Sequence, residues 1–378
     1  MSDRATRREE ATTSEGILYM ALELGHRKWQ IRFGDGERTR DVAMPARDLG
    51  RLWEEIGKAK ARFGMKEEAE VGSCYEAGWD GFWLHRHLVG AGVKNLVVDS
   101  ASIEVSRRRR RAKTDRLDAA KLLAMRIRHE RGERVWSVVR VPEEEAEDVR
   151  QIGREVERLK KELRQHRSRI ESLLVTQGVV EKVRRGFGDR LEQIRRWDGS
   201  GLPEHLQEAL RREYERLELC RRHLREVERR QREMVEAGES ETMRKAAALA
   251  ELRGIGNRGS WVFTTEIFGW RRFRNRKELA SCVGLTPMPY QSGECSREQG
   301  ISKVGNRRVR WLLVEIAWGW LRYQPDSRLS RWYMERFAGG GARMRRIGIV
   351  AMARRLLIEL WHYVEHGAIP EGAQFKTT

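Results

Sequence analysis

The sequence has few cysteines, no signal-peptide core and no membrane span. Its four cysteines form no C-x-x-C pair, which argues against a zinc site and a disulfide framework. Residues 1–15 are polar and expected to be disordered, and the apolar segment 347–364 carries charges at helical spacing, as an amphipathic helix does. We therefore expect a protein of the reduced cytoplasm that makes no contact with a membrane.

The sequence has fewer acidic than basic residues. The 378 residues include 76 Lys and Arg against 57 Asp and Glu, which gives a formal net charge of +19. Basic side chains gather around residues 107–116, 271–277 and 303–310. One such stretch is often a solvated face, but three of them beside candidate catalytic residues favour a polyanionic partner. The length allows two or three domains, each with its own core.

Residues 16–141 alternate between strand-like and helix-like patterns. Three short apolar runs predict an antiparallel meander of strands, and further helices and strands follow in turn. This order is that of an α/β, ribonuclease H-like domain. The expected strands cover 17–24, 28–33, 38–44, 71–76 and 95–98, and the expected helices cover 49–63, 82–89 and a segment that begins near residue 115.

Four acidic residues of this region, Glu23, Glu76, Asp115 and Asp118, fall where such a fold gathers metal ligands. The two glutamates lie in apolar runs whose strands end side by side, and the two aspartates share one face at the start of a helix. Crowded carboxylates repel one another unless divalent cations neutralise them. The set predicts Mg²⁺ chemistry at a phosphate. The alternative is that the glutamates are surface strand ends and that Asp115 caps its helix.

Residues 142–245 show a different pattern, which begins after Pro142 and an acidic cluster. From Ile152 the apolar residues alternate four and three apart, and this heptad spacing returns after a glycine-containing break at 178–203. We expect an α-helical coiled-coil hairpin. It is either an intramolecular spacer or a dimerisation element, since so narrow an apolar stripe requires a partner.

Residues 246–378 predict a mainly α-helical region with a loop rich in proline and glycine at 284–293. Gly254 and Gly256 stand in a turn of a kind that can present backbone N–H groups to a phosphate, although helix turns commonly contain glycine. A basic and aromatic helix over 307–321 carries tryptophans that favour a core role over base stacking. These are Trp311, Trp318 and Trp320.

Segments 75–78, 113–119 and 284–310 resemble the DEDD transposases of the insertion sequence 110 family, which are RNA-guided recombinases of bacterial mobile elements. The segments occur in the family's order, and the resemblance spans nearly the whole chain. It implies a RuvC-like nuclease domain over 16–141, a coiled-coil connection, and a C-terminal transposase domain with a serine nucleophile.

The resemblance assigns a role to each candidate catalytic residue. Ser292 takes the place of the nucleophile, and Glu23, Glu76, Asp115 and Asp118 take the places of an acidic tetrad that holds two Mg²⁺ ions, for which Mn²⁺ can substitute. The implied chemistry is a covalent phosphoserine link to DNA, release of a 3′ hydroxyl and exchange of strands without hydrolysis. Ser292 is far from the tetrad in sequence, so either the chain folds back or a second protomer supplies the serine.

Glu23 stands where the family has aspartate, and its longer side chain moves the carboxylate by about a bond length. Asp99, which follows the strand at 95–98, is the alternative ligand. The resemblance favours a composite site shared between the protomers of a dimer or tetramer.

Donor and target DNA duplexes and a structured bridge RNA are the implied partners, and the bacterial cytoplasm at the nucleoid is the implied location. A basic chain without a helix-turn-helix motif agrees with selection of DNA by base pairing, in which the protein contacts backbone phosphates. The candidate contacts are Arg107, Arg108, Arg109, Arg110, Arg111, Lys113, Gly254, Gly256, Lys303, Asn306, Arg307, Arg308 and Arg310.

Two other functions fit the residues. A junction-resolving nuclease needs the tetrad and not Ser292, which beside Gly293 is also an ordinary turn residue. A nucleic-acid-binding protein without activity needs neither, and Glu23 in the place of aspartate would then record the loss of catalysis. A covalent protein–DNA adduct that Ser292→Ala abolishes separates the recombinase from both.

Overall fold

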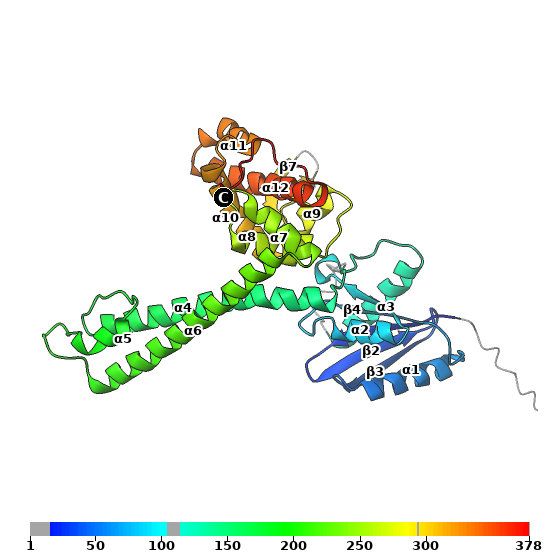
Figure 1. Ribbon diagram of the computed structural model, residues 1–378. Helices are drawn as coiled ribbons and strands as arrows, with labels where there is room; N and C mark the ends of the chain where they lie inside the picture. Colours follow the sequence, from blue (N-terminus) through cyan, green and yellow to red (C-terminus); the bar gives the residue numbers. More distant parts are fainter. Residues whose placement is uncertain (1–15, 104–113, 293–294, 378) are drawn as a thin grey trace, which may run out of the picture. The chain divides into compact units, whose positions relative to one another are not determined.

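The computed structural model describes residues 16–103, 114–292 and 295–377 (Figure 1). The chain divides into two compact units, Met1–Val141 and Pro142–Thr378. The expected disorder of residues 1–15 falls outside the described residues. So do six of the candidate phosphate contacts, which are Arg107, Arg108, Arg109, Arg110, Arg111 and Lys113.

A five-stranded mixed sheet with the order β3-β2-β1-β4-β5 forms the centre of the first unit. The central strand β1 (Leu18–Leu24) runs antiparallel to β2 (Lys28–Gly34) and parallel to β4 (Val71–Glu76). The expected antiparallel meander is present, and the assignment to the ribonuclease H-like fold stays a prediction. The outer strands are β3 (Thr39–Pro45), antiparallel to β2, and β5 (Lys94–Val98), parallel to β4.

Helices cover both faces of this sheet. One face packs Leu18, Met20 and Leu22 of β1 against α1 (Leu49–Phe63) and α2 (Trp83–Gly90). The other face packs Ala21 and Cys74 against α3 (Asp115–Glu130). Because side chains alternate along a strand, one strand supplies both cores. The first unit is therefore a three-layer α/β domain, in which a short 3₁₀ turn (Ser100–Ser102) follows β5.

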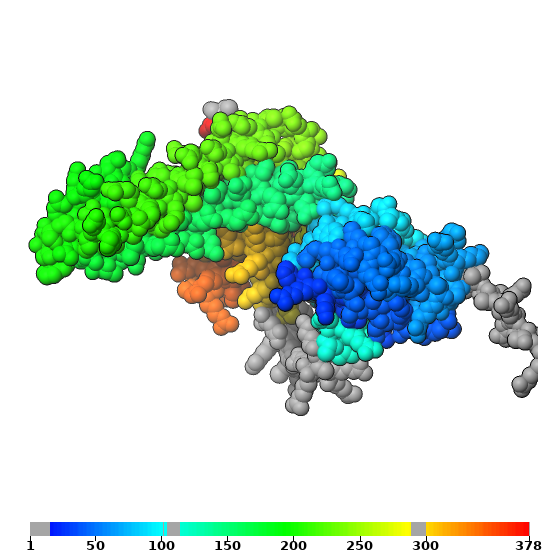
Figure 2. Space-filling view, turned by 90° about the horizontal axis from the view of Figure 1, so that it is seen from below, coloured from blue at the N-terminus to red at the C-terminus, as the bar shows by residue number. Residues whose placement is uncertain are grey.

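Two long helices, α4 (Glu144–Val175) and α6 (Glu204–Ala237), form a hairpin in the second unit. Lys160 pairs with Glu228 at 2.7 Å and His166 with Glu213 at 2.7 Å, so the helices run antiparallel. They lie against each other along the arm drawn in green (Figure 2). Each helix covers the apolar stripe of the other, and dimerisation through this hairpin stays a prediction.

The connection between the two long helices has structure of its own. It contains α5 (Phe187–Arg190) and a 3₁₀ turn (Leu191–Gln193), whose apolar residues pack against Ile170 and Leu210 of the arm. The glycine-containing break predicted at 178–203 is therefore a folded cap on the far end of the hairpin.

The remaining helices pack around a large apolar core, which includes Trp320. Within the described ranges, no helix has the length and apolar character that crossing a bilayer requires. The helices are α7 (Glu241–Glu251), α8 (Asn257–Phe263) with a π-helical continuation (Thr264–Phe268), α9 (Arg276–Cys282), α10 (Arg307–Tyr323), α11 (Arg328–Tyr333) with a π-helical continuation (Met334–Ala338), and α12 (Ala342–His366).

Two predictions for this region need correction. The expected loop at 284–293 contains a strand, β6 (Pro287–Ser292), which pairs with β7 (Cys295–Ile301) in a hairpin. The core role of the tryptophans is confirmed for Trp320, whose indole N–H donates to Ser327 at 2.9 Å, and is wrong for Trp311 and Trp318. These two residues are 50% and 44% exposed because they lie on the outer face of α10.

Candidate functional site

Glu23 and Glu76 are neighbours at the carboxyl ends of two parallel strands. The register pairs Leu22 with Tyr75, so the residues that follow stand side by side. Two residues earlier on the same sheet face is the Ala21 and Cys74 pair, which packs against α3. Both glutamates therefore belong to the α3 face, where Glu23 is half-buried and Glu76 is exposed. Ligands of open α/β sheets bind at this end of the strands.

Helix α3 crosses that face in the direction opposite to β4. The Sγ of Cys74 is 3.7 Å from the carbonyl oxygen of Leu122, and a Cβ added to Gly72 would lie 2.8 Å from the Arg126 guanidinium. Four helix residues rise about 6 Å and two strand residues about 6.6 Å, so the two elements stay in step. Each turn of α3 towards its amino end therefore faces a strand residue nearer the carboxyl end of β4.

One more turn of α3 towards its amino end places Asp118 level with Glu76. Asp115, the first residue of α3, lies about one turn beyond Asp118. Asp118 is half-buried and Asp115 is exposed. Thr114 is the N-cap of α3, because its hydroxyl accepts the amide of Leu117 at 3.4 Å. The alternative that Asp115 serves as the helix cap is therefore wrong. The backbone brings all four acidic positions to one edge of the sheet.

Asp99 lies at the same edge, one residue beyond β5. Val98 is the register partner of Glu76, and the Asp99 amide donates to the Ser137 carbonyl at 2.9 Å. Asp99 is half-buried and stands one strand further from Glu23 than Glu76 does. Its position as an alternative acidic group at this edge therefore agrees with the topology.

Among the described residues, no three Asp, Glu, His or Cys side chains gather closely enough to hold a metal ion. Carboxylate oxygens are nevertheless the donors that Mg²⁺ takes, and the exposed side chains of Glu76 and Asp115 rotate on a fast timescale. The donor type and the backbone placement fit a divalent cation, and rotation of side chains is needed to close the site.

Ser292 is the last residue of β6, where its register partner is Cys295. The other end of this hairpin is anchored by the chain that follows it. The Ser302 amide donates to the Thr286 carbonyl at 2.9 Å and the Lys303 amide to the Gly284 carbonyl at 3.1 Å. These bonds fix the base of the hairpin to the segment that leads into α10.

Two glycines make this close approach possible. Gly284 and Gly305 have φ values of +69° and +92°, in the region that side chains rarely adopt. A Cβ added to Gly284 would lie 2.0 Å from the Val304 carbonyl oxygen, and one added to Gly305 would lie 2.2 Å from the Cys282 carbonyl oxygen. These two glycines therefore allow the close packing that anchors the base of the serine hairpin.

Asn306 and Arg310 complete the anchor. The Asn306 side chain caps α10 by accepting the Val309 amide at 3.2 Å. The Arg310 guanidinium donates to the Val283 carbonyl at 2.8 Å, and its burial, together with the neighbouring charge of Arg307, lowers its pKa. Both residues are occupied within the protein, and their contact with nucleic acid stays a prediction.

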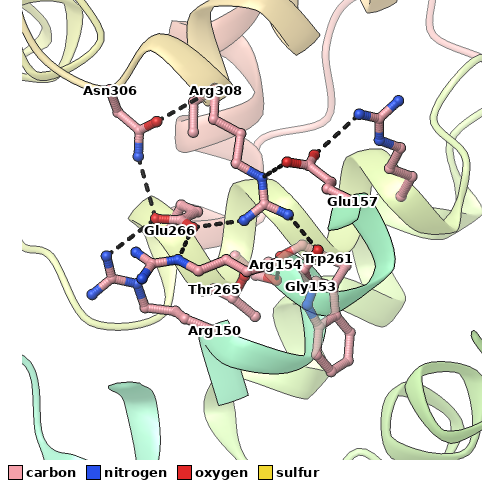
Figure 3. A network of polar contacts seen from close by, with 12 residues as sticks. Arg150, Gly153, Arg154, Glu157, Trp261, Thr265, Glu266, Asn306 and Arg308 are labelled. Carbon is pink, nitrogen blue, oxygen red and sulfur yellow. Dashed lines mark hydrogen bonds and ion pairs between the residues drawn. The ribbon is translucent and has the colours of Figure 1, made fainter. Parts of the chain in front are cut away.

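A buried glutamate, Glu266, joins this anchor to the helical arm (Figure 3). Its carboxylate is 2.8 Å from Arg308 of α10, 3.3 Å from Arg150 of α4 and 3.3 Å from the amide nitrogen of Asn306. Arg154 lies further off, at 3.7 Å. Burial lowers the pKa of Arg150, and the Glu266 charge opposes that shift. Sequence reasoning missed Glu266, and the one acidic residue in the apolar segment 259–268 was the available signal.

The remaining candidate contacts differ in exposure. Arg308 also donates to the Gly153 carbonyl at 2.8 Å, so its guanidinium is held inside the protein, whereas Lys303 and Arg307 are exposed. Gly254 has φ +87° and lies against Tyr323, and Gly256 is the N-cap of α8. Turn geometry thus accounts for Gly254, and a phosphate contact by either glycine stays a prediction.

Comparison with known proteins assigns the chain to a family. Residues 246–331, which contain Glu266 and the β6–β7 hairpin, match the family model described as "Transposase IS116/IS110/IS902 family". The protein "Putative transposase y4rJ" of Sinorhizobium fredii is 41% identical over 395 aligned positions, which cover 99% of each chain. The chain therefore belongs to the IS116/IS110/IS902 family of transposases.

Two further relatives agree with this assignment. The protein "Putative transposase y4qE" of Sinorhizobium fredii is 30% identical over 258 positions, covering 67% of this chain and 59% of the relative. The "Transposase for insertion sequence element IS1328" of Yersinia enterocolitica is 31% identical over 90 positions, which cover 23% of this chain and 27% of the relative. The resemblance inferred from the motifs is confirmed at the level of the family.

Proposed function

We propose that this transposase exchanges DNA strands with Ser292 as nucleophile and with Mg²⁺ held by Glu23, Glu76, Asp115 and Asp118. The observation that supports it best is the placement of four acidic positions at one edge of the sheet. Glu76, Asp115 and Asp118 have no ion-pair partner among the described residues, although the chain carries a formal charge of +19. Within residues 16–103, 114–292 and 295–377, these three carboxylates are without an arginine partner, which leaves them available to a divalent cation.

The chemistry is a pair of transesterifications. In the first, the Ser292 hydroxyl oxygen bonds to phosphorus, the bond from phosphorus to the 3′ oxygen breaks, and the leaving oxygen takes up a proton. A bound Mg²⁺ would polarise the phosphate oxygens, which a weak serine nucleophile requires. In the second, a 3′ hydroxyl of the partner duplex attacks the phosphoserine and releases the serine. One phosphoester replaces another each time, so no strand is lost to hydrolysis.

We assign the serine and the acidic residues of one active site to different protomers, as the resemblance implies. Two inactive variants, Ser292→Ala and Asp118→Asn, test this arrangement when they are mixed. A composite site predicts that the mixture regains strand transfer, because one kind of site then contains both intact parts. No recovery, with the two variants shown to exchange subunits, would place both parts on one chain.

Guidance by a structured bridge RNA is proposed on the resemblance and on the basic composition. The test is to purify the protein from its host, sequence the RNA that copurifies and add it back with donor and target duplexes. Joining of the duplexes that depends on the RNA sequence supports guidance. Joining by RNA-free protein excludes it.

A covalent adduct is the decisive test of the serine chemistry. Labelled DNA that stays with the protein through denaturing electrophoresis is expected for the wild type, and Ser292→Ala should abolish it. Ser168→Ala, a change at an exposed serine of the helical arm, is the matched control. Cleavage without any adduct would instead identify a junction-resolving nuclease.

Metal binding has a readout of its own. Mn²⁺ binding followed by electron paramagnetic resonance should be weakened by Asp115→Asn with Asp118→Asn and unaffected by Asp189→Asn in the far cap of the arm. Equal Mn²⁺ binding by the wild type, the paired variant and Asp189→Asn would show that the tetrad does not hold the metal. Activity that survives the paired change would favour a protein without metal catalysis.

A further inference from the structure

An open groove of about 1180 Å³ lies between α9, the base of the β6–β7 hairpin and α12. These elements lie together in Figure 1, and all residues that line the groove belong to the second unit. Its volume exceeds the roughly 300–1,000 Å³ of small-molecule pockets. An extended ligand therefore suits it better than a compact one.

The walls of the groove are strongly basic. Eight basic side chains and one acidic side chain line it. The acidic residue, Glu359, is paired with Arg328. The other seven basic residues form no ion pair with any residue that the structure describes, which leaves their charge for a ligand. They are Arg276, Lys277, Lys303, Arg343, Arg346, Arg354 and Arg355.

The charges at the start of α12 are placed against the preference of the helix itself. Arg343 and Arg346 lie in its first turns, where no acidic residue occurs. The amino end of a helix carries partial positive charge and favours anions, so arginine there opposes the helix dipole. A bound anion would neutralise these arginines and remove the conflict. The two arginines are therefore better explained by anion binding than by a contribution to the stability of the helix.

The floor of the groove is apolar. Leu285 and Pro287 line it from the hairpin side, and Ile347, Val350 and Ile358 line it from α12. At one side the Arg355 guanidinium stacks 4.0 Å above the ring of Trp332. Apolar and aromatic surface between basic walls accepts the bases of an unpaired strand on the floor and its phosphates at the rims. A paired duplex does not bind in this way, because its bases are stacked inside.

We propose that this groove binds an unpaired DNA strand next to the scissile phosphate. DNA is named as the occupant because the hairpin that forms one wall carries Ser292, so the inference rests on the proposed function. From Pro287, which lines the groove, β6 runs five residues to Ser292, or about 17 Å. The groove therefore lies about 17 Å along the hairpin from the serine that attacks the phosphate.

The test compares two charge reversals of equal size in the full chain. Arg343→Glu with Arg346→Glu changes the groove, and Arg222→Glu with Arg230→Glu changes exposed residues of α6. The groove change agrees with the helix dipole, so folding should be kept, and thermal unfolding checks this. Arg343→Gln with Arg346→Gln is the neutral companion should the reversed charges disturb the fold.

Binding is measured by fluorescence anisotropy with a labelled single strand of about 20 nucleotides, longer than the roughly 4–16 that single-strand sites cover. We expect the groove variant to bind on the order of 10- to 100-fold more weakly, and the slope of log K against log salt to fall by about 1.4, or 0.7 for each lost phosphate contact. The α6 variant should match the wild type.

Three results would overturn the inference: equal binding by the groove and α6 variants, an equal loss of affinity for duplex DNA, or a groove-dependent preference for RNA of the same sequence. Ser292→Ala separates this inference from the proposed function, because it should keep strand binding and lose the adduct. A wild type that binds through the groove and forms no adduct would refute the serine chemistry alone.

Discussion

Replacement of Glu266 by glutamine is the sharpest test of how the second unit is held together. The change keeps the size of the side chain and removes its charge. Glu266 is 3% exposed, and its partners Arg150 and Arg308 are 12% and 17% exposed. In the variant these two guanidinium groups stay in a poorly solvated place, where Arg308 keeps only Glu157, 2.9 Å from its Nε, as an ion-pair partner.

The expected loss follows from this burial. Removing one member of a buried ion pair costs about 3–5 kcal/mol. Partial exposure of the two arginines, and the Glu157 carboxylate that remains beside Arg308, offset some of that cost, which puts the expected loss at about 3 kcal/mol. Arg154 adds little, because its side chain is 42% exposed and lies 3.7 Å away. For a unit of this size the melting temperature should fall by about 6–12 °C.

Calorimetry of the full chain measures the effect, with Glu233→Gln as the control. Glu233 is 3.7 Å from Arg229 on α6, and these side chains are 60% and 68% exposed, so the control should lose under about 0.5 kcal/mol. If the melting temperature of Glu266→Gln falls no further than that of the control, Glu266 is not the link between α4 and α10.

Three further outcomes are expected. Gly305→Ala should destabilise the β6–β7 hairpin by about 1–3 kcal/mol and speed its amide hydrogen exchange, whereas Gly300→Ala, at φ +86° with no atom within 4 Å, should do less. Burial raises the pKa of Cys74 to about 12. At pH 8 the Cys74 thiol of the native protein should therefore react with iodoacetamide about 10³-fold more slowly than the same thiol in unfolded protein. Burial alone would raise the pKa of Glu213, but hydrogen bonds from His166 and nearby arginines lower it. Its contribution to stability is therefore full above the unfolded pKa of about 4.3 and lost below it, and urea unfolding from pH 7 to pH 3 should show a smaller acid loss in Glu213→Gln.

Much of the fold could be predicted because local pattern and tertiary packing agree. The alternation of Trp29, Ile31 and Phe33 marks β2, and the predicted helix 49–63 has the observed bounds, with Asp48 as its N-cap and Gly64 as its C-cap. The β6–β7 hairpin was missed because prolines disfavour strands. A two-stranded ribbon tolerates them, since each strand has a free edge. The register shift between Pro287 and Pro289 marks the adjustment.

The candidate site was predictable only where it depends on the ends of elements. Strand ends and a helix start place Glu23, Glu76, Asp115 and Asp118 at one edge, and those positions follow from pattern. The basic groove does not, because it forms where α12 packs beside a hairpin more than forty residues earlier in the chain. Glu266 is likewise explained only by the arginines that surround it.

The segment 302–310 links three parts of the second unit. Its first residues anchor the hairpin of Ser292, Asn306 caps α10, and both Asn306 and Arg308 bind Glu266, which in turn holds α4 of the arm. Close-packed interiors transmit displacement rather than absorb it. A partner that moves α4 would therefore move the base of the serine hairpin as well. In a composite site, where another protomer must supply the acidic residues, such a linkage would tie the placement of the nucleophile to assembly through the arm.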